Sequence, residues 1–139
     1  MAIQTKQQKR AEFALKSLDK YKDSGVLSDH ATFIVGMPNM ILSNGFGQSL
    51  AFLKSKYSSD KSGKKDNDKY KFVFGILKSY LQKEFSSSFA DIKDDFDFLS
   101  RINSISQSEY IKMQEEVLRM LEWLKRYARA FEEVKVSEQ

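Results

Sequence analysis

The last third of the chain repeats its apolar residues at helical spacing for longer than any other part of the sequence. Apolar positions recur every three or four residues over about six turns of α-helix. Just before them, Ser106 and Glu109 have the spacing of a capping box, which indicates where a helix begins. We therefore expect one long amphipathic helix. Its apolar face consists of Tyr110, Met113, Val117, Met120, Leu124, Ala128 and Phe131.

The remainder of the sequence predicts the same class of structure. No stretch alternates apolar and polar residues as a half-buried strand does, and helical periodicity recurs along the chain. We expect an all-α fold in which residues 1–139 form a single domain, a compact bundle of five to six helices. The earlier helical patterns cover about residues 3–22, 29–43, 46–56, 70–81 and 89–101.

Local signals predict where these helices stop. Gly25 is the expected end of the first helix, and Pro38 predicts a kink or a broken turn in the second. Asn44-Gly45 predicts a left-handed residue between the second and third helices. Residues 57–67 are expected to form an exposed loop, and residues 133–139 a frayed tail.

Composition limits the function classes. The chain has 23 Lys and Arg residues against 19 Asp and Glu, a net charge of +4. Because a polyanion responds to local charge, the placement of these residues matters more than the total. The absence of cysteine excludes disulfides, thiolate metal sites and cysteine nucleophiles. No apolar run approaches the ~20 residues of a membrane span and no signal peptide is evident, so we expect a cytoplasmic protein without membrane contact.

The first helical segment carries a basic face opposite its apolar face. Glu12 and Asp19 flank this face, but no acidic residue lies within it. Such a face is either a solvated lysine surface or a surface that follows a phosphate backbone, with the aromatic ring against a base or ribose. Its residues are Lys6, Lys9, Phe13, Lys16 and Lys20.

The long helix carries a second group of basic and aromatic residues, away from its apolar face. Glu115 and Glu122 precede the two arginines of this group by four residues, which predicts exposed intrahelical ion pairs. The tryptophan fits a protein contact and an internal core equally well. The residues of this second group are Lys112, Arg119, Trp123 and Arg126.

Other candidate chemistry is weaker. Residues 45–49 contain two glycines but match no nucleotide-binding motif, so they predict a tight turn, although the helix that follows could hold one phosphate. His30 is expected to cap a helix or lie on the surface. Four aspartates favour a solvated acidic face over a cation site, and that face could dock on the basic face of another copy or on another subunit. They are Asp91, Asp94, Asp95 and Asp97. We expect no catalytic residues, no cofactor and no metal site.

Three segments, in order along the chain, resemble one known family. They are Arg10-Ala11-x-Phe13-Ala14-Leu15, the run 44–53 (NGFGQSLAFL) and the run 121–131 (LEWLKRYARAF). Together they are similar to the small all-helical subunit of the type III-B (Cmr) CRISPR RNA-guided effector complexes. The resemblance covers most of the chain and is thinnest around residues 57–67 and 86–105.

The resemblance implies a non-catalytic subunit in antiviral defence. Copies of such a subunit stack along the guide–target duplex, opposite the backbone subunits, meet the large multidomain subunit at one end, and contact the phosphate backbone of guide and target RNA. A helical protein–protein adaptor without nucleic-acid contact is the alternative. On the resemblance, we expect RNA binding by Lys6, Lys9, Arg10, Phe13, Lys16 and Lys20, and subunit contact by Lys112, Arg119, Trp123 and Arg126.

Overall fold

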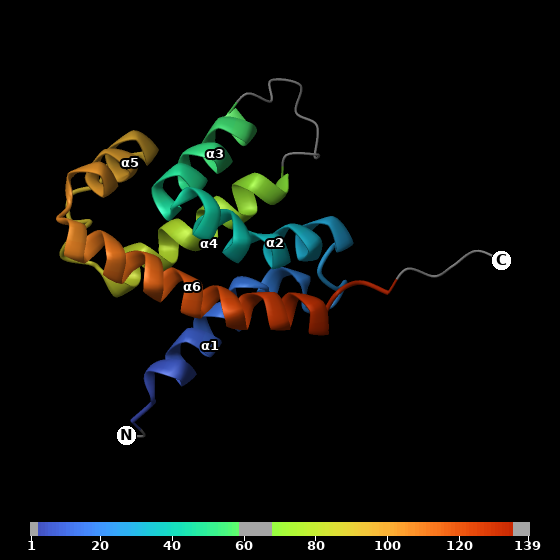
Figure 1. Ribbon diagram of the computed structural model, residues 1–139. Helices are drawn as coiled ribbons and strands as arrows, with labels where there is room; N and C mark the ends of the chain where they lie inside the picture. The colour runs from blue at the N-terminus through green and yellow to red at the C-terminus, as the bar shows by residue number, and fades with distance from the viewer. Residues whose placement is uncertain (1–2, 59–67, 135–139) are drawn as a thin grey trace. The chain divides into compact units, whose positions relative to one another are not determined.

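The computed structural model describes residues 3–58 and 68–134, and over these residues the fold is all-α, as predicted (Figure 1). The described residues form six α-helices and one short 3₁₀ helix, joined by turns. Tyr57 and Ser58, expected in the loop, are helical; the rest of the predicted loop (59–67) and residues 135–139 of the predicted tail lie outside the described residues. The helices are α1 (Lys6–Ser17), η1 (Asp19–Tyr21), α2 (Ser28–Asn44), α3 (Phe46–Ser58), α4 (Asp68–Glu84), α5 (Asp95–Ser104) and α6 (Gln107–Ala130).

The chain divides into two compact units. The first unit contains the residues up to Met37 and those from Arg119 onward, and the second contains Pro38–Leu118. Helices α2 and α6 therefore each contribute to both units. The expectation of one domain over residues 1–139 stays a prediction.

In the first unit, the beginning of the chain is joined to its end by a main-chain clasp. The Val26 amide donates to the Phe131 carbonyl at 2.7 Å, and the Glu133 amide donates to the Val26 carbonyl at 2.7 Å. Gly25 makes this approach possible: its φ is +85°, and a Cβ there would lie 2.8 Å from the Glu133 Cα. The clasp thus requires glycine at this turn. The core beside it contains Ala14, Leu18, Val26, Leu121, Leu124 and Ala128.

Helix α1 is shorter than predicted. Thr5 caps it in a capping box with Gln8, and it ends at Ser17 rather than near residue 22. After Leu18 the backbone tightens into η1. Residues 19–21 therefore do not continue the faces of α1.

In the second unit, α3, α4 and α5 pack around a cluster of aromatic rings. The Phe98 ring lies 5.0 Å from the ring of Phe89 and 6.0 Å from that of Phe74, centroid to centroid. The predicted helix 89–101 was wrong in its start, because Asp94 caps α5 and the helix begins at Asp95. Its buried face holds Phe98, whereas Phe96, two residues earlier, is 79% exposed.

Other boundaries follow their local signals. Ser106 accepts a hydrogen bond from the Glu109 amide at 3.2 Å, where the capping box predicted the start of α6. Gly45 has φ +83°, as predicted, but α2 runs through Pro38 without a broken turn. Among the described residues, no helix is long and apolar enough to cross a membrane.

Candidate nucleic-acid interface

The predicted basic face of α1 is present only in part. Lys6 and Lys9 are exposed, and no ion pair with another described residue is found for either. Lys16 is also exposed but lies 2.8 Å from the Glu12 carboxylate, and this hydrogen bond raises the pKa of Lys16. Lys20 belongs to η1, where its amine sits 4.9 Å from the centre of the Tyr21 ring. On α1 itself, two amines therefore remain without an ion pair to any residue of 3–58 or 68–134.

Arg10 lies apart from these lysines. Its side chain is buried, with 8% of the residue exposed, whereas Lys6 and Lys9 are exposed. Phe13, the aromatic of the predicted face, is half-buried. The sequence held a signal for this placement, because Arg10 precedes the fully buried Ala14 by four residues and so shares its side of the helix.

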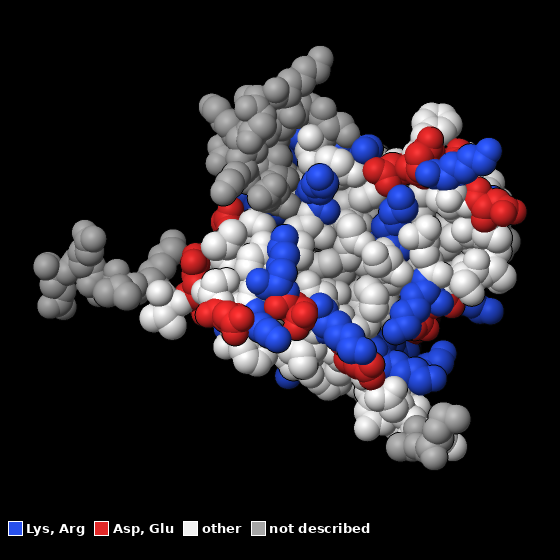
Figure 2. Space-filling view, turned by 180° about the vertical axis from the view of Figure 1, so that it is seen from behind, with Lys and Arg blue, Asp and Glu red and all other residues white. Residues whose placement is uncertain are grey.

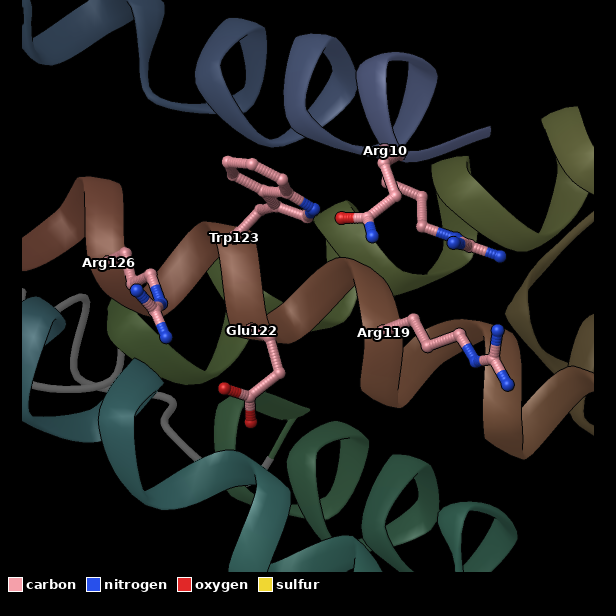
Figure 3. Close-up of a pocket in the computed structure, with 6 residues that line it drawn as sticks. Arg10, Arg119, Glu122, Trp123 and Arg126 are labelled. Atoms are coloured by element: carbon pink, nitrogen blue, oxygen red, sulfur yellow. The ribbon is translucent and has the colours of Figure 1, made fainter. Parts of the chain in front are cut away.

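Arg10 belongs to a cavity of about 500 Å³ in the first unit. Figure 3 shows the Trp123 indole and the Arg10 side chain between the ribbons of α1 and α6, with Arg119 and Arg126 leaving α6 on either side of Glu122. The sequence had assigned Arg10 to one surface and the α6 residues to another, and the fold brings them together. The cavity is lined by Gln7 and Arg10 of α1 and by Arg119, Glu122, Trp123 and Arg126 of α6.

The cavity is basic, because its three arginines face a single carboxylate. The predicted ion pairs of α6 were wrong: Glu122 binds Lys125 at 3.1 Å. Among residues 3–58 and 68–134, no ion pair is found for the exposed Arg119 and Arg126. Lys125 lies one turn along the same helix from Glu122, so it competes with Arg126 for that carboxylate.

Trp123 is positioned by its own helix. Its ring stacks on that of Tyr127, with centroids 5.9 Å apart and planes 29° apart. The indole is half-buried and lines the cavity, so it is neither a fully buried core residue nor an isolated surface residue. Lys112, the remaining residue predicted with it, is exposed and lies in the part of α6 that belongs to the second unit.

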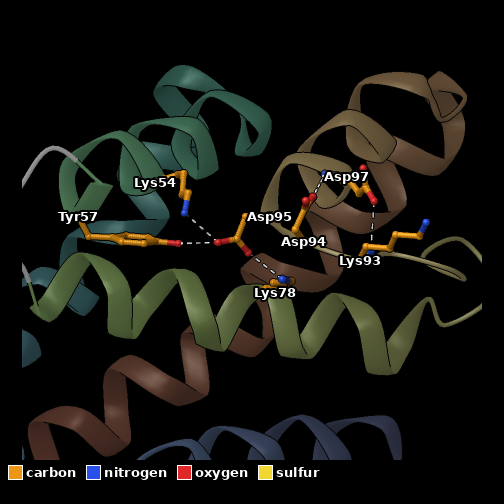
Figure 4. Close-up of polar contacts among 7 residues, drawn as sticks. All are labelled: Lys54, Tyr57, Lys78, Lys93, Asp94, Asp95 and Asp97. Atoms are coloured by element: carbon orange, nitrogen blue, oxygen red, sulfur yellow. Dashed lines mark hydrogen bonds and ion pairs between the residues drawn. The ribbon is translucent and has the colours of Figure 1, made fainter.

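The charges of the second unit are paired differently (Figure 4). The Asp95 carboxylate of α5 accepts hydrogen bonds from Lys78 of α4 at 2.7 Å, and from Lys54 and Tyr57 of α3 at 3.0 Å each. Burial, the largest influence, favours the protonated acid. The three hydrogen bonds together outweigh it and lower the pKa of Asp95 to about 2. Asp95 thus ties three helices together.

The neighbouring aspartates have local structural roles, so the predicted acidic helical face does not exist. Asp94 accepts from the Asp97 amide at 2.9 Å, and the Asp97 carboxylate accepts from the Lys93 amide at 3.3 Å. Asp91 lies outside the helix, with φ +63°. In the described parts of the chain, no group of three or more His, Asp or Glu side chains is placed to hold a metal ion.

Two further expectations are corrected. The amides at the start of α3 are already bonded within the unit: that of Phe46 donates to Gln114 at 3.1 Å, and that of Gly47 to the Tyr110 hydroxyl at 2.9 Å. The predicted phosphate position is therefore filled by side chains of α6. His30 is buried rather than on the surface, 2.9 Å from Asp29.

On the face shown in Figure 2, Lys and Arg side chains are interspersed with Asp and Glu side chains, so individual pairings decide which cations can meet a ligand. The fold and the cavity together define a small all-helical protein with a basic, aromatic-lined recess. A family model described as CRISPR-associated protein (Cas_Cmr5) matches residues 6–131, and the chain belongs to this family. It is therefore a subunit of the multi-subunit Cmr complex of type III-B systems, in a family of structural subunits.

Proposed function

We propose that this chain is a non-catalytic structural subunit that contacts the backbone of guide and target RNA through basic residues, in cytoplasmic antiviral defence. Its apolar faces contact the large multidomain subunit, the backbone subunits and further copies of the chain. Membership of the Cas_Cmr5 family supports the place in the complex.

The observation that carries the RNA contact is the state of the amines on α1. Lys6 and Lys9 lie on one helix, three residues apart, exposed and without an ion pair among the described residues. An unpaired exposed ammonium can neutralise a phosphate and release its counterions, whereas a paired one must first give up its carboxylate. Lys16 is such a paired amine and contributes less to this surface.

The test is the salt dependence of binding to single-stranded RNA. The double variant Lys6→Glu with Lys9→Glu is expected to lower the log–log salt slope by about 0.7 per lost contact. Lys71→Glu with Lys93→Glu changes the net charge equally on exposed positions of the second unit and serves as the control. Equal slopes for the two double variants would remove α1 from the proposal.

A pure protein–protein adaptor is the second candidate, and one observation favours it. An apolar recess of about 250 Å³ in the first unit is lined in part by Leu15 and Phe131, which are 45% and 52% exposed. An adaptor predicts that Leu15→Ala with Phe131→Ala disrupts assembly with the other subunits, while the purified chain never binds RNA.

A further inference from the structure

We propose that the arginine cavity of the first unit binds one unpaired nucleotide of single-stranded RNA, with its base against Trp123 and its phosphates at the arginines. This inference rests on the proposed function. It adds a site that holds a base by its face, and it assigns Arg119, Trp123 and Arg126 to RNA rather than to a neighbouring subunit.

The cavity carries exposed positive charge. Arg119 and Arg126 bring two exposed guanidinium groups to its lining, to which Glu122 contributes a carboxylate. Glu122 is drawn toward Lys125, and no ion pair is found for Arg119 or Arg126 among the described residues. A guanidinium can donate two parallel hydrogen bonds to a phosphate, so this set suits a phosphodiester.

The arginines of α6 have a spacing that suits a nucleotide. Arg119 and Arg126 are seven residues apart on α6, so they lie on one side of the helix at a separation of about 10 Å along its axis. Trp123 falls between them in sequence, and Arg10 comes from α1 across the cavity (Figure 3). The cations therefore surround the aromatic ring, as a nucleotide with a phosphate on each side of its sugar would require.

The cavity also offers an aromatic ring on which a base can stack. The Trp123 indole is half-buried, lines the cavity, and is braced by the Tyr127 ring. A volume of about 500 Å³ lies within the range of small-molecule sites, about 300–1,000 Å³. Stacking on an aromatic side chain contributes about 1–3 kcal/mol per base and needs an exposed base face. Bases inside a duplex have no such face, so the site selects unpaired RNA.

The experiment uses the full chain and two readouts. Trp123 is the only tryptophan, so its fluorescence reports on the cavity, while the anisotropy of a dye-labelled oligonucleotide reports on RNA binding. The probes are a single-stranded RNA 10-mer, the same 10-mer with abasic residues, the matching duplex, adenosine monophosphate and a decaglutamate peptide. We expect the single strand to quench Trp123, and the abasic strand and the duplex to bind with little quenching.

Two exposed positions give variants that should fold. Arg119→Gln with Arg126→Gln is expected to raise the RNA concentration needed for half-maximal quenching by about tenfold or more, because two charge-assisted contacts are lost. The matched control is Lys22→Gln with Arg129→Gln, which removes the same charge from the first unit outside the cavity lining.

The outcomes separate the two proposals. RNA that binds by anisotropy without changing Trp123 fluorescence would overturn the nucleotide site and leave the proposed function standing. Equal quenching by abasic RNA or decaglutamate would also overturn it, because the cavity would then recognise charge alone. Quenching by adenosine monophosphate in a chain that binds no RNA would overturn both proposals, because the cavity would then hold a free nucleotide and not one in an RNA strand.

Discussion

The arginine cavity of the first unit and the Asp95 cluster of the second unit use similar residues in opposite ways. In the cluster, one carboxylate receives two lysines and a tyrosine hydroxyl, all at 3.0 Å or less. In the cavity, Glu122 lies beside Arg119 and Arg126 in the lining, but its carboxylate binds Lys125, which is outside the lining.

The cations of the two regions differ in their pairing rather than in their number. Lys54 and Lys78 both pair with the Asp95 carboxylate, and the hydrogen bond from Lys54 to Asp95 raises the pKa of Lys54. Such pairs stabilise a fold only through geometry that satisfies both partners. Arg119 and Arg126 have no comparable ion pair within the described residues, so their charge is available to a ligand.

The largest expected effect comes from breaking the cluster. Asp95→Asn removes the charge that holds two lysines, and should lower the free energy of unfolding by about 2 kcal/mol, as measured by urea denaturation at pH 7. Asp91→Asn is the matched control, since Asp91 is exposed and asparagine tolerates its positive φ. Equal urea midpoints for the two variants would contradict the structural role of Asp95.

Acid should remove the same stabilisation without mutation. The folded-state pKa of Asp95, about 2, lies below the ordinary aspartate value of 3.8, so the ionised carboxylate stabilises the folded state. That contribution is fully present above about pH 5, declines as the pH falls through the unfolded-state pKa, and is mostly gone by pH 2. The unfolding free energies of wild type and Asp95→Asn should therefore converge between pH 5 and pH 2. A constant difference over this range would assign the effect to packing.

The smallest expected effect is in the cavity. Arg119→Gln with Arg126→Gln should change the free energy of unfolding by no more than about 0.5 kcal/mol, because these exposed side chains make no ion pair with a residue that the structure describes. Lys78→Gln, a cation substitution in the cluster, should cost more in the same urea experiment. A cavity variant as unstable as Lys78→Gln would mean that the two regions do not differ.

Periodicity predicted the class of fold well, since it depends on many residues at once. The face of α6 from Met113 to Ala128 is buried as expected, and Gly45 takes the left-handed conformation. The start of α5 was missed because Asp94 was assigned to a charged face, whereas its side chain caps the helix. A capping residue and a helical residue of the same type look alike in one sequence.

The candidate site was harder to predict, because it depends on which side chains meet across helices. The basic residues of α1 and the basic and aromatic residues of α6 were recognised separately. To predict their shared cavity, one would have to know that Arg10 faces inward and that Glu122 pairs with Lys125 and not with Arg126. Competition among carboxylate partners within one turn of helix is decided by rotamers, which a sequence does not specify.

The main-chain clasp at Val26 has a consequence for how the polypeptide matures. The second unit is continuous, so all of its residues have been synthesised before Arg119 and later residues are added to the chain. The first unit joins residues from the start of the chain to partners more than a hundred positions later, including Phe131 and Glu133. Helix α1 cannot complete its packing in the first unit until those partners are synthesised. The arginine cavity, which Arg10 lines, is therefore completed last, after translation has passed Glu133.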